Sequence, residues 1–172
     1  MNLILQTQRL VIKKPELKDK QPIIEALNNW EVVKWLVRVP YPYTAEDANH
    51  WITHLTKDNY AFNIYLDSKL IGGIGLSQEN EHSDYVLGYW LAEEHWGKGY
   101  TTEACTKIIS YAVQDLKITK IKSAYLIDND RSAKVLKKLG FQEIGKSSKY
   151  SLSKKKEVED IELELDLRRK IA

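Results

Sequence analysis

Two glycines that follow an apolar strand have the type and spacing to present bare backbone amides to an anion. The strand is expected over residues 85–91, and Gly97 and Gly99 stand between a charged pair and a helical pattern. Glycine has no Cβ to keep a diphosphate from the backbone, the first N–H groups of a helix lack intrahelical partners, and the helix dipole adds positive charge. The stretch is interpreted as an anion site, although a plain tight turn would use the same glycines.

The helix after these glycines is predicted from the spacing of its apolar residues. They recur every three or four positions, which makes one face core: Ala104, Cys105, Ile108, Ile109, Ala112 and Leu116. Cys105 is the single cysteine of the chain. Because it lies on the apolar face, we expect an inert core thiol and neither a disulfide nor a cysteine-rich zinc site.

The other elements follow from period and turn signals. Helices are expected over residues 17–28, 31–36, 44–55 and 132–139, and strands over 10–13, 61–66, 69–76, 120–127 and twice after Phe141. Thr44 with Asp47 resembles a capping box, Asp67-Ser68 is typical of a hairpin turn, and Gly140 of a helix end. Helices followed by strands mixed with helices predict an α+β domain.

The composition is that of one globular domain, residues 1–172, with its core between about 8 and 168. Hydrophobic residues make up 43% and charged residues 29%, and the net charge is only +2, which argues against a dedicated nucleic-acid binder. No apolar run approaches the length of a membrane span, and no leader is visible. We therefore expect a cytoplasmic protein that binds neither nucleic acid nor membrane and contains no metal.

Three pieces of the sequence resemble the GNAT acetyltransferases, in particular the branch similar to ribosomal-protein N-terminal acetyltransferases. They are Gly88-Tyr89-Trp90-Leu91, the stretch from Trp96 to Ala104, and Asn129-Asp130-Arg131-Ser132 leading to Lys138-Leu139-Gly140-Phe141. The order of elements agrees from about residue 10 to 167. The resemblance implies a twisted, mixed, mostly antiparallel sheet of about seven strands, flanked by four to five helices.

The same resemblance implies acetyl-CoA as the donor. Its pyrophosphate is expected on the loop from Trp96 to Thr101, and its pantetheine beside the strand end. The implied cofactor-binding residues are Leu91, Ala92, Glu93, Trp96, Gly97, Lys98, Gly99, Tyr100, Thr101, Asn129 and Ser132. Pantetheine carries two amides, so it can extend a sheet where a strand has splayed from its neighbour. A backbone N–H at the strand end could then stabilise the oxyanion.

Two positions depart from the family pattern. Glu94 stands where many members have Arg or Gln, and its carboxylate would not help to bind phosphate. Leu136 stands where numerous members have a tyrosine that protonates the leaving thiolate. The resemblance makes Ser132 the substitute acid, but a serine there can equally be the helix N-cap. Asn129 is implied to bind pantetheine and is also a common turn residue.

An acceptor ammonium must lose its proton, directly to a base or through water, before the amine can attack a thioester. Glu93 is the predicted base, since it lies at the strand end where the acetyl group should sit. A solvated loop carboxylate is the alternative interpretation. Glu103 is a second choice, but its place in the first helical turn is already explained by the dipole. His95 is adjacent and titratable near neutrality.

The acceptor pocket is expected from the aromatic N-terminal half. Arg38, Tyr41, Tyr43 and Trp90 are the predicted substrate-binding residues, and Pro40 and Pro42 keep the two tyrosines out of regular structure. The predicted activity is direct transfer in a ternary complex, from acetyl-CoA to a small amine or a peptide N-terminus, by a monomer or homodimer. The alternative is a non-catalytic acyl-CoA sensor, which the changes at Glu94 and Leu136 keep open.

Overall fold

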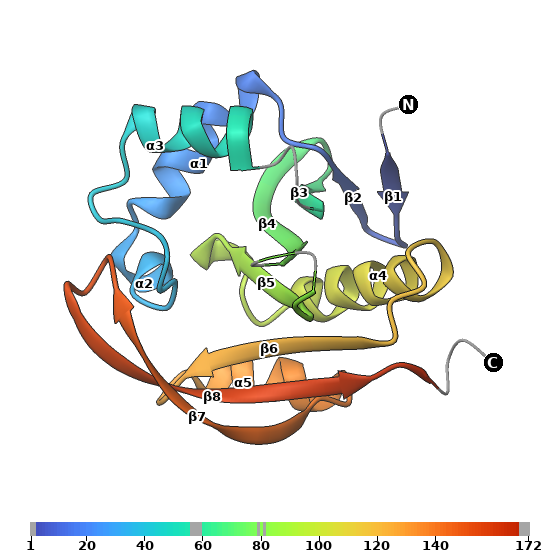
Figure 1. The fold of residues 1–172 in the computed structure, drawn as a ribbon. Helices are drawn as coiled ribbons and strands as arrows, with labels where there is room; N and C mark the ends of the chain where they lie inside the picture. The colour runs from blue at the N-terminus through green and yellow to red at the C-terminus, as the bar shows by residue number, and fades with distance from the viewer. Residues whose placement is uncertain (1–2, 56–59, 79, 81, 169–172) are drawn as a thin grey trace.

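One eight-stranded sheet forms the centre of the computed structural model, which describes residues 3–55, 60–78, 80 and 82–168 (Figure 1). Its strands, in the order in which they pair, are β1 (Ile4–Gln6), β2 (Leu10–Lys13), β3 (Tyr60–Leu66), β4 (Lys69–Ser77), β5 (Tyr85–Leu91), β6 (Lys120–Leu126), β8 (Lys156–Asp166) and β7 (Gln142–Ser151). All neighbours are antiparallel except β5 and β6. The mixed, mostly antiparallel α+β sheet is thus confirmed, with β1 as the strand that the sequence pattern missed.

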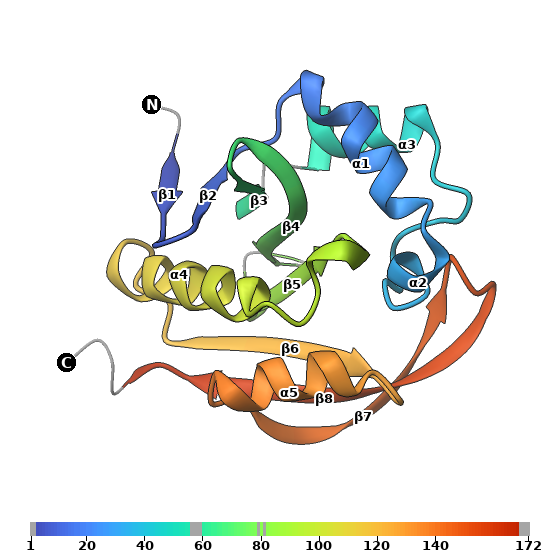
Figure 2. The same ribbon diagram turned by 180° about the vertical axis from the view of Figure 1, so that it is seen from behind.

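Five α-helices of the described chain flank this sheet: α1 (Lys20–Leu27), α2 (Trp30–Val33), α3 (Ala45–His50), α4 (Tyr100–Gln114) and α5 (Asp130–Lys138). In both views α1, α2 and α3 gather at one end of the molecule, apart from α4 and α5 (Figures 1 and 2). Within the described residues, none of the helices is long and apolar enough to cross a membrane.

Two apolar clusters form the core. The larger one joins the sheet to α4 and includes Phe62, Ile64, Ile108, Ile121 and Leu163. The smaller one lies among α1, α2 and α3. Cys105 belongs to the larger cluster and is wholly buried. Burial raises the pKa of its thiol, which therefore stays protonated, as its place on the apolar face predicted.

Local signals in the sequence set several element ends. Thr44 caps α3, because its Oγ1 accepts from the Asp47 N–H at 3.1 Å while its own N–H donates to the Asp47 carboxylate at 2.8 Å. Asp67 and Ser68 make the β3–β4 turn with φ of 47° and 67°, the left-handed pair that a two-residue hairpin prefers. Gly140, with φ of 94°, follows the end of α5.

The close approach of β4 and β5 explains the glycines of β4. A Cβ at Gly72 would overlap the carbonyl oxygen of Trp90, and one at Gly73 would come within 2.5 Å of the Trp90 indole nitrogen. Side chains are therefore excluded from these positions of β4. Because Gly72 and Gly73 have no side chains, Trp90 and the end of β5 can pack closely against β4.

The parallel pair β5 and β6 separates soon after it begins. The two strands pair only at Tyr85–Ile121 and Val86–Lys122, although β5 continues to Leu91 and β6 to Leu126. At the first unpaired step, the Ser123 hydroxyl donates to the Leu87 carbonyl at 2.9 Å. Beyond that bridge the two strand edges diverge, so the middle of the sheet is open.

Candidate functional site

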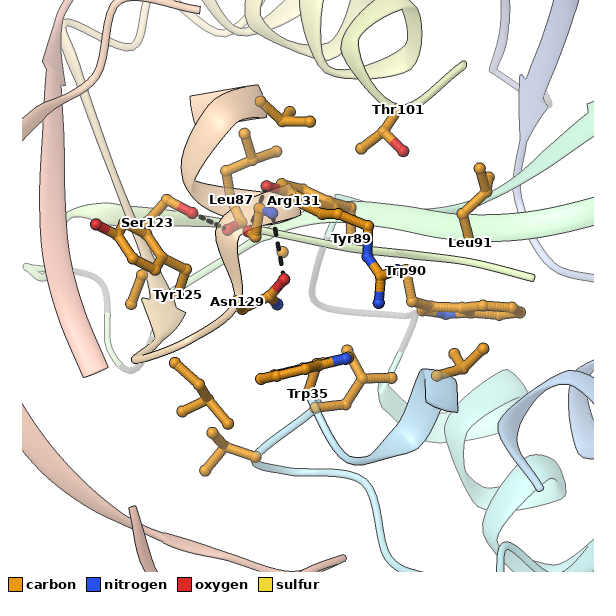
Figure 3. Close-up of a pocket in the computed structure, with 18 of the residues that line it drawn as sticks. Trp35, Leu87, Tyr89, Trp90, Leu91, Thr101, Ser123, Tyr125, Asn129 and Arg131 are labelled. Atoms are coloured by element: carbon orange, nitrogen blue, oxygen red, sulfur yellow. Dashed lines mark hydrogen bonds between the residues drawn. The ribbon is translucent and has the colours of Figure 1, made fainter. Parts of the chain in front are cut away.

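A cleft of about 610 Å³ occupies the place where β5 and β6 diverge (Figure 3). Its walls come from both strands, from the first turns of α4 and α5, and from residues 35–39 after α2. Lys149 of β7 and Asp160 of β8 complete the lining. The turn between β7 and β8 is tied to the segment at α2, because the Leu152 N–H donates to the Val37 carbonyl at 2.9 Å. The cleft therefore joins the two halves of the sheet with the N-terminal helices.

The N-terminus of the 15-residue helix α4 opens onto this cleft. Gly99 is its N-cap, with φ of 82°, and Gly97 has φ of 74°. No described side chain caps the helix, and the N–H groups of Tyr100 and Thr101 have no acceptor among the described residues. The glycines thus make a tight turn and also leave the dipole end of the helix exposed to the cleft.

Along the edge of β5 that faces the cleft, one residue has backbone groups that make no hydrogen bond across the opening to another described residue. The Leu87 carbonyl accepts from Ser123, and the Leu91 carbonyl accepts from the Trp96 indole N–H at 2.8 Å. Alternate residues of a strand direct their backbone groups to the same edge, so those of Tyr89 also face the opening. A chain that carries amides could pair with Tyr89 there.

Ala92 and Lys98 do not belong to this cleft. The N–H of Ala92, a predicted cofactor-binding residue, donates to the Ile71 carbonyl at 2.8 Å. Lys98 extends away, and its Nζ donates to the Glu94 carbonyl at 2.8 Å. The remaining predicted cofactor residues on the lining are Leu91, Trp96, Gly97, Gly99, Tyr100, Thr101, Asn129 and Ser132.

Ser132 is not the N-cap of α5. That position is taken by Asn129, whose Oδ1 accepts from the Ser132 N–H at 3.3 Å. Ser132 lies one turn into the helix, where its Oγ is 2.8 Å from the hydroxyl of Tyr89. Burial raises the pKa of Tyr89, so its phenol is protonated at neutral pH. The capping interpretation of Ser132 was therefore wrong, and Asn129 is the cap.

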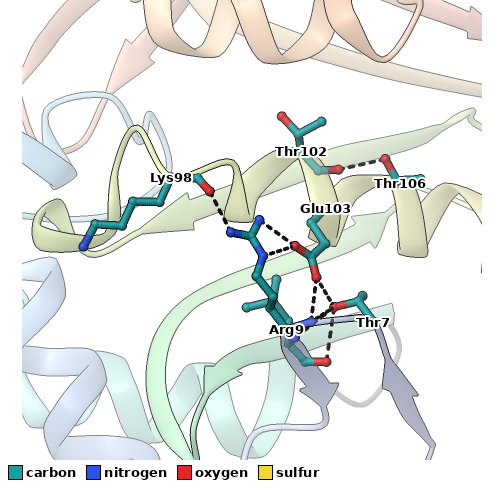
Figure 4. A network of polar contacts seen from close by, with 7 residues as sticks. Thr7, Arg9, Lys98, Thr102, Glu103 and Thr106 are labelled. Carbon is teal, nitrogen blue, oxygen red and sulfur yellow. Dashed lines mark hydrogen bonds and ion pairs between the residues drawn. The ribbon is translucent and has the colours of Figure 1, made fainter.

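The predicted carboxylate bases lie outside the lining of the cleft. Glu93 is exposed at the end of β5, and its Oε2 accepts from the Asn29 side chain at 2.7 Å. Glu103 accepts from Thr7 Oγ1 at 2.5 Å and from Arg9 Nε at 2.7 Å (Figure 4). Burial raises the pKa of Glu103, but the hydrogen bonds from Thr7 and Arg9 lower it further, so the carboxylate is a weak base.

His95 lines the cleft beside the glycine loop. Both of its ring nitrogens are shielded and have no hydrogen-bond partner among the described residues. Burial lowers the pKa of His95, and the ammonium groups of Lys98 and Lys69 lower it further against the opposing effect of Glu94. His95 is therefore neutral at pH 7.

Of the predicted acceptor-binding residues, Arg38 and Trp90 line the cleft. Tyr43 does not, because it is 6% exposed and belongs to the smaller core cluster. Both backbone groups of Tyr43 are held by the Asn28 side chain, at 2.9 and 2.7 Å. Tyr41 packs edge-on against Trp30, with ring centroids 5.2 Å apart, and lies outside the lining.

Several lining residues were not predicted. Asp160 is only 2% exposed and accepts from Ser147 Oγ at 2.5 Å and from Lys149 Nζ at 2.6 Å. The indole N–H of Trp35 is buried and has no acceptor in the described part of the chain. In sequence, Asp160 stands with the polar set of an alternating strand, which predicts solvent rather than a cleft. Tyr89 lay within the quoted Gly-Tyr-Trp-Leu motif, which was the available signal.

No three His, Cys, Asp or Glu side chains of the described residues gather in a way that could hold a metal ion.

The model of the family described as "Acetyltransferase (GNAT) domain" matches residues 9–142. An uncharacterized N-acetyltransferase, p20 of Bacillus licheniformis, is 31% identical over 159 residues, which cover 87% of this chain and 88% of that protein.

Two solved structures share the fold at low sequence identity. The ribosomal-protein-S5-alanine acetyltransferase of Vibrio fischeri superposes with a TM-score of 0.79 at 21% identity, over 95% of this chain and 96% of that one. Mycobacterium smegmatis RimJ, in complex with CoA-disulfide, superposes with a TM-score of 0.81 at 15% identity, over 98% of this chain and 88% of that one.

Proposed function

Because the chain belongs to the GNAT acetyltransferase family and is an N-acetyltransferase, we propose that it transfers an acetyl group directly from acetyl-CoA to a primary amine bound in the same cleft. One observation carries this proposal: the opening between β5 and β6 and the uncapped N-terminus of α4 meet in a single cleft. The first offers a strand edge to pantetheine, and the second offers free N–H groups to a diphosphate.

The residues fit the donor in two places. Gly97, Gly99 and the N–H groups of Tyr100 and Thr101 would hold the diphosphate, since a Cβ at Gly97 would meet open space and no described side chain caps the helix by a hydrogen bond. The backbone of Tyr89 would pair with pantetheine. When bound, acetyl-CoA supplies an activated acyl group as its thioester.

Transfer would occur beside the end of β5. The backbone groups of Leu91 face the same edge as those of Tyr89, so the Leu91 N–H is placed to donate to the oxyanion. Holding the amine against the thioester supplies most of the rate gain. An acyl-enzyme on Cys105 is disfavoured because that thiol is wholly buried and protonated.

The acceptor would approach from the side formed by residues 35–39 and the β7–β8 pair. The Vibrio fischeri protein of similar fold is a ribosomal-protein-S5-alanine acetyltransferase. We propose a protein or peptide N-terminus as the acceptor of this chain also. The support is the shared fold and the indole N–H of Trp35, which is available to a peptide carbonyl.

Two measurements on the full chain test the proposed function. Calorimetry should give saturable binding of acetyl-CoA. Mass spectrometry should then show acetylated product from peptides with a free N-terminal amine, and none from the same peptides with that amine formylated. Absence of saturable binding contradicts the proposal. Binding without transfer to any amine, across peptides and small amines, supports the non-catalytic sensor instead. Transfer to formylated peptides that contain lysine would indicate that the acceptor is a lysine side chain and not the N-terminal amine.

A further inference from the structure

A tyrosine of β5, Tyr89, reaches the cleft, whereas the family pattern places a tyrosine on α5. Leu136, at the position where the pattern has tyrosine, is wholly buried and has no polar group to offer. Tyr89 of β5 lines the cleft (Figure 3), and its hydroxyl is 2.8 Å from Ser132 Oγ. The two hydroxyls come from different elements that both line the cleft, the strand β5 and the helix α5.

The direction of this hydrogen bond follows from the partners that each hydroxyl has. Within the described residues, Ser132 Oγ is the one partner of the Tyr89 hydroxyl. If Ser132 donated to Tyr89, the phenolic hydrogen would be left without an acceptor beside a buried ring, which is unfavourable. If Tyr89 donates, its hydrogen is satisfied. The Ser132 hydrogen is then free to point elsewhere.

We propose that Tyr89 is a positioning residue that donates to Ser132 and thereby directs the Ser132 O–H toward the sulfur of the departing CoA. This inference rests on the proposed function of the cleft. As the carbon–sulfur bond breaks, the electron pair and negative charge move to sulfur, and the Ser132 O–H donates a hydrogen bond to it. Tyr89 keeps its own proton throughout. The amine gives up a proton to water as the carbon–nitrogen bond forms, and the thiolate takes up a proton from water afterwards, so neither side chain needs to be recharged.

A double-mutant cycle tests the proposal. Ser132→Ala should lower kcat by about 100-fold, the lower range for a group that assists a leaving atom. Tyr89→Phe should lower kcat by about tenfold, as expected for the loss of one hydrogen bond that orients such a group. The two effects should not multiply, because Tyr89 acts through Ser132. The affinity for acetyl-CoA, measured by calorimetry, should stay unchanged, so that kcat falls while binding does not.

Tyr85→Phe is the matched control, because Tyr85 lies on the same strand outside the cleft and packs against Tyr60 at a centroid distance of 6.0 Å. It should leave kcat unchanged. A Tyr89→Phe protein with the kcat of the wild type overturns the proposal, as does a double variant whose loss is the product of the two single losses. Those outcomes require an active wild type, so they differ from failure of the proposed function, in which the unaltered chain shows no transfer at all.

Discussion

Asp160 is the one carboxylate among the described residues that line the cleft. Its carboxylate is 2% exposed, lines the cleft, and is held by Ser147 and by Lys149, whose side chain is 42% exposed. A buried carboxylate is stable when it is paired and hydrogen-bonded. The Asp160 carboxylate would attract an acceptor ammonium that enters the cleft. The carboxylate of Glu93, the base predicted from the sequence, is exposed to solvent and accepts a hydrogen bond from the Asn29 side chain.

We predict that Asp160→Asn raises the KM for the amine by about tenfold or more, the loss expected for one hydrogen bond to a charged group. The affinity for acetyl-CoA should not change. Asparagine keeps the shape and can keep the contact with Ser147. Glu93→Gln is the comparison, and it should leave initial rates within about twofold because that carboxylate lies outside the cleft. Steady-state kinetics in which Glu93→Gln loses turnover and Asp160→Asn does not would restore Glu93 as the base.

At the residue scale, the sequence predicted those features that depend only on the backbone properties of a residue type. Gly97 and Gly99 were identified because their φ values and lack of Cβ are properties of the residue type. Tyr43 and Asp160 were misread or missed because their surroundings come from distant segments. Tyr43 is held by Asn28, and Asp160 accepts hydrogen bonds from Ser147 and Lys149 of the neighbouring strand β7. Local pattern carries no information about such contacts.

The first turn of α4 is the element on which donor binding depends. Thr101 lies in that turn, lines the cleft and is drawn beside the helix end in Figure 3. The helix has no side-chain cap, so its positive end is available to an anion. Any negative charge built into this turn should compete with the diphosphate.

We predict that Thr101→Asp weakens acetyl-CoA binding by about 100-fold, since like charges placed together cost several kcal/mol. Thr101→Asn, which has the same size without the charge, should bind within about threefold of wild type. Aspartate in the first turn favours the helix, so the melting temperature of the Asp variant should not fall. Equal affinities of the two variants by calorimetry would place the diphosphate elsewhere.

A second feature of α4 is its attachment to the N-terminal strands. Glu103 receives hydrogen bonds from Thr7 and Arg9, and the Arg9 guanidinium also donates to the Lys98 carbonyl at 3.0 Å (Figure 4). The loop that carries the two glycines is therefore tied to the segment between β1 and β2. This carboxylate has a structural role, in agreement with its lowered pKa.

We predict that Glu103→Gln lowers the free energy of unfolding by about 1 kcal/mol at pH 7, a small value because the pair is partly exposed. The pKa of Glu103 is lowered in the folded chain, so its stabilisation is fully present above the ordinary carboxyl range and is lost as the pH falls through the folded pKa. The difference between variant and wild type should therefore shrink as the pH falls through the folded pKa of Glu103 and vanish below it.

Urea titrations across this pH range measure that difference. Glu46→Gln is the control, because Glu46 also lies in the first turn of a helix, α3, without such a network. A difference of equal size for both variants would assign the effect to the helix dipole alone.

Elements with a strong apolar period, or with clear capping or turn residues at their ends, were predictable. The strand over residues 85–91, the capped start of α3 and the hairpin at Asp67-Ser68 were all confirmed. The strand β1 was missed because it has three residues and buries only one of them. The start of α5 was placed two residues late, since Asn129 rather than Ser132 supplies the cap.

At the scale of the whole molecule, the site exists because the sheet is incomplete at its centre. The pairing of β5 with β6 ends after two residue pairs, whereas β6 pairs with β8 along its whole length and β5 pairs with β4 as far as Leu91. Each strand is therefore held by its outer neighbour while the gap between them stays open. Such a gap is set by long-range pairing and cannot be read from either strand alone, although the family resemblance implied it.

The central claim is that this gap and the start of α4 together bind the donor. An amide-resolved NMR titration of the full chain with CoA tests it most directly. The account predicts that the backbone amides of Tyr89, Tyr100 and Thr101 shift together along one saturable curve. Saturable binding that leaves these three amides unchanged, or no binding at all, would contradict it.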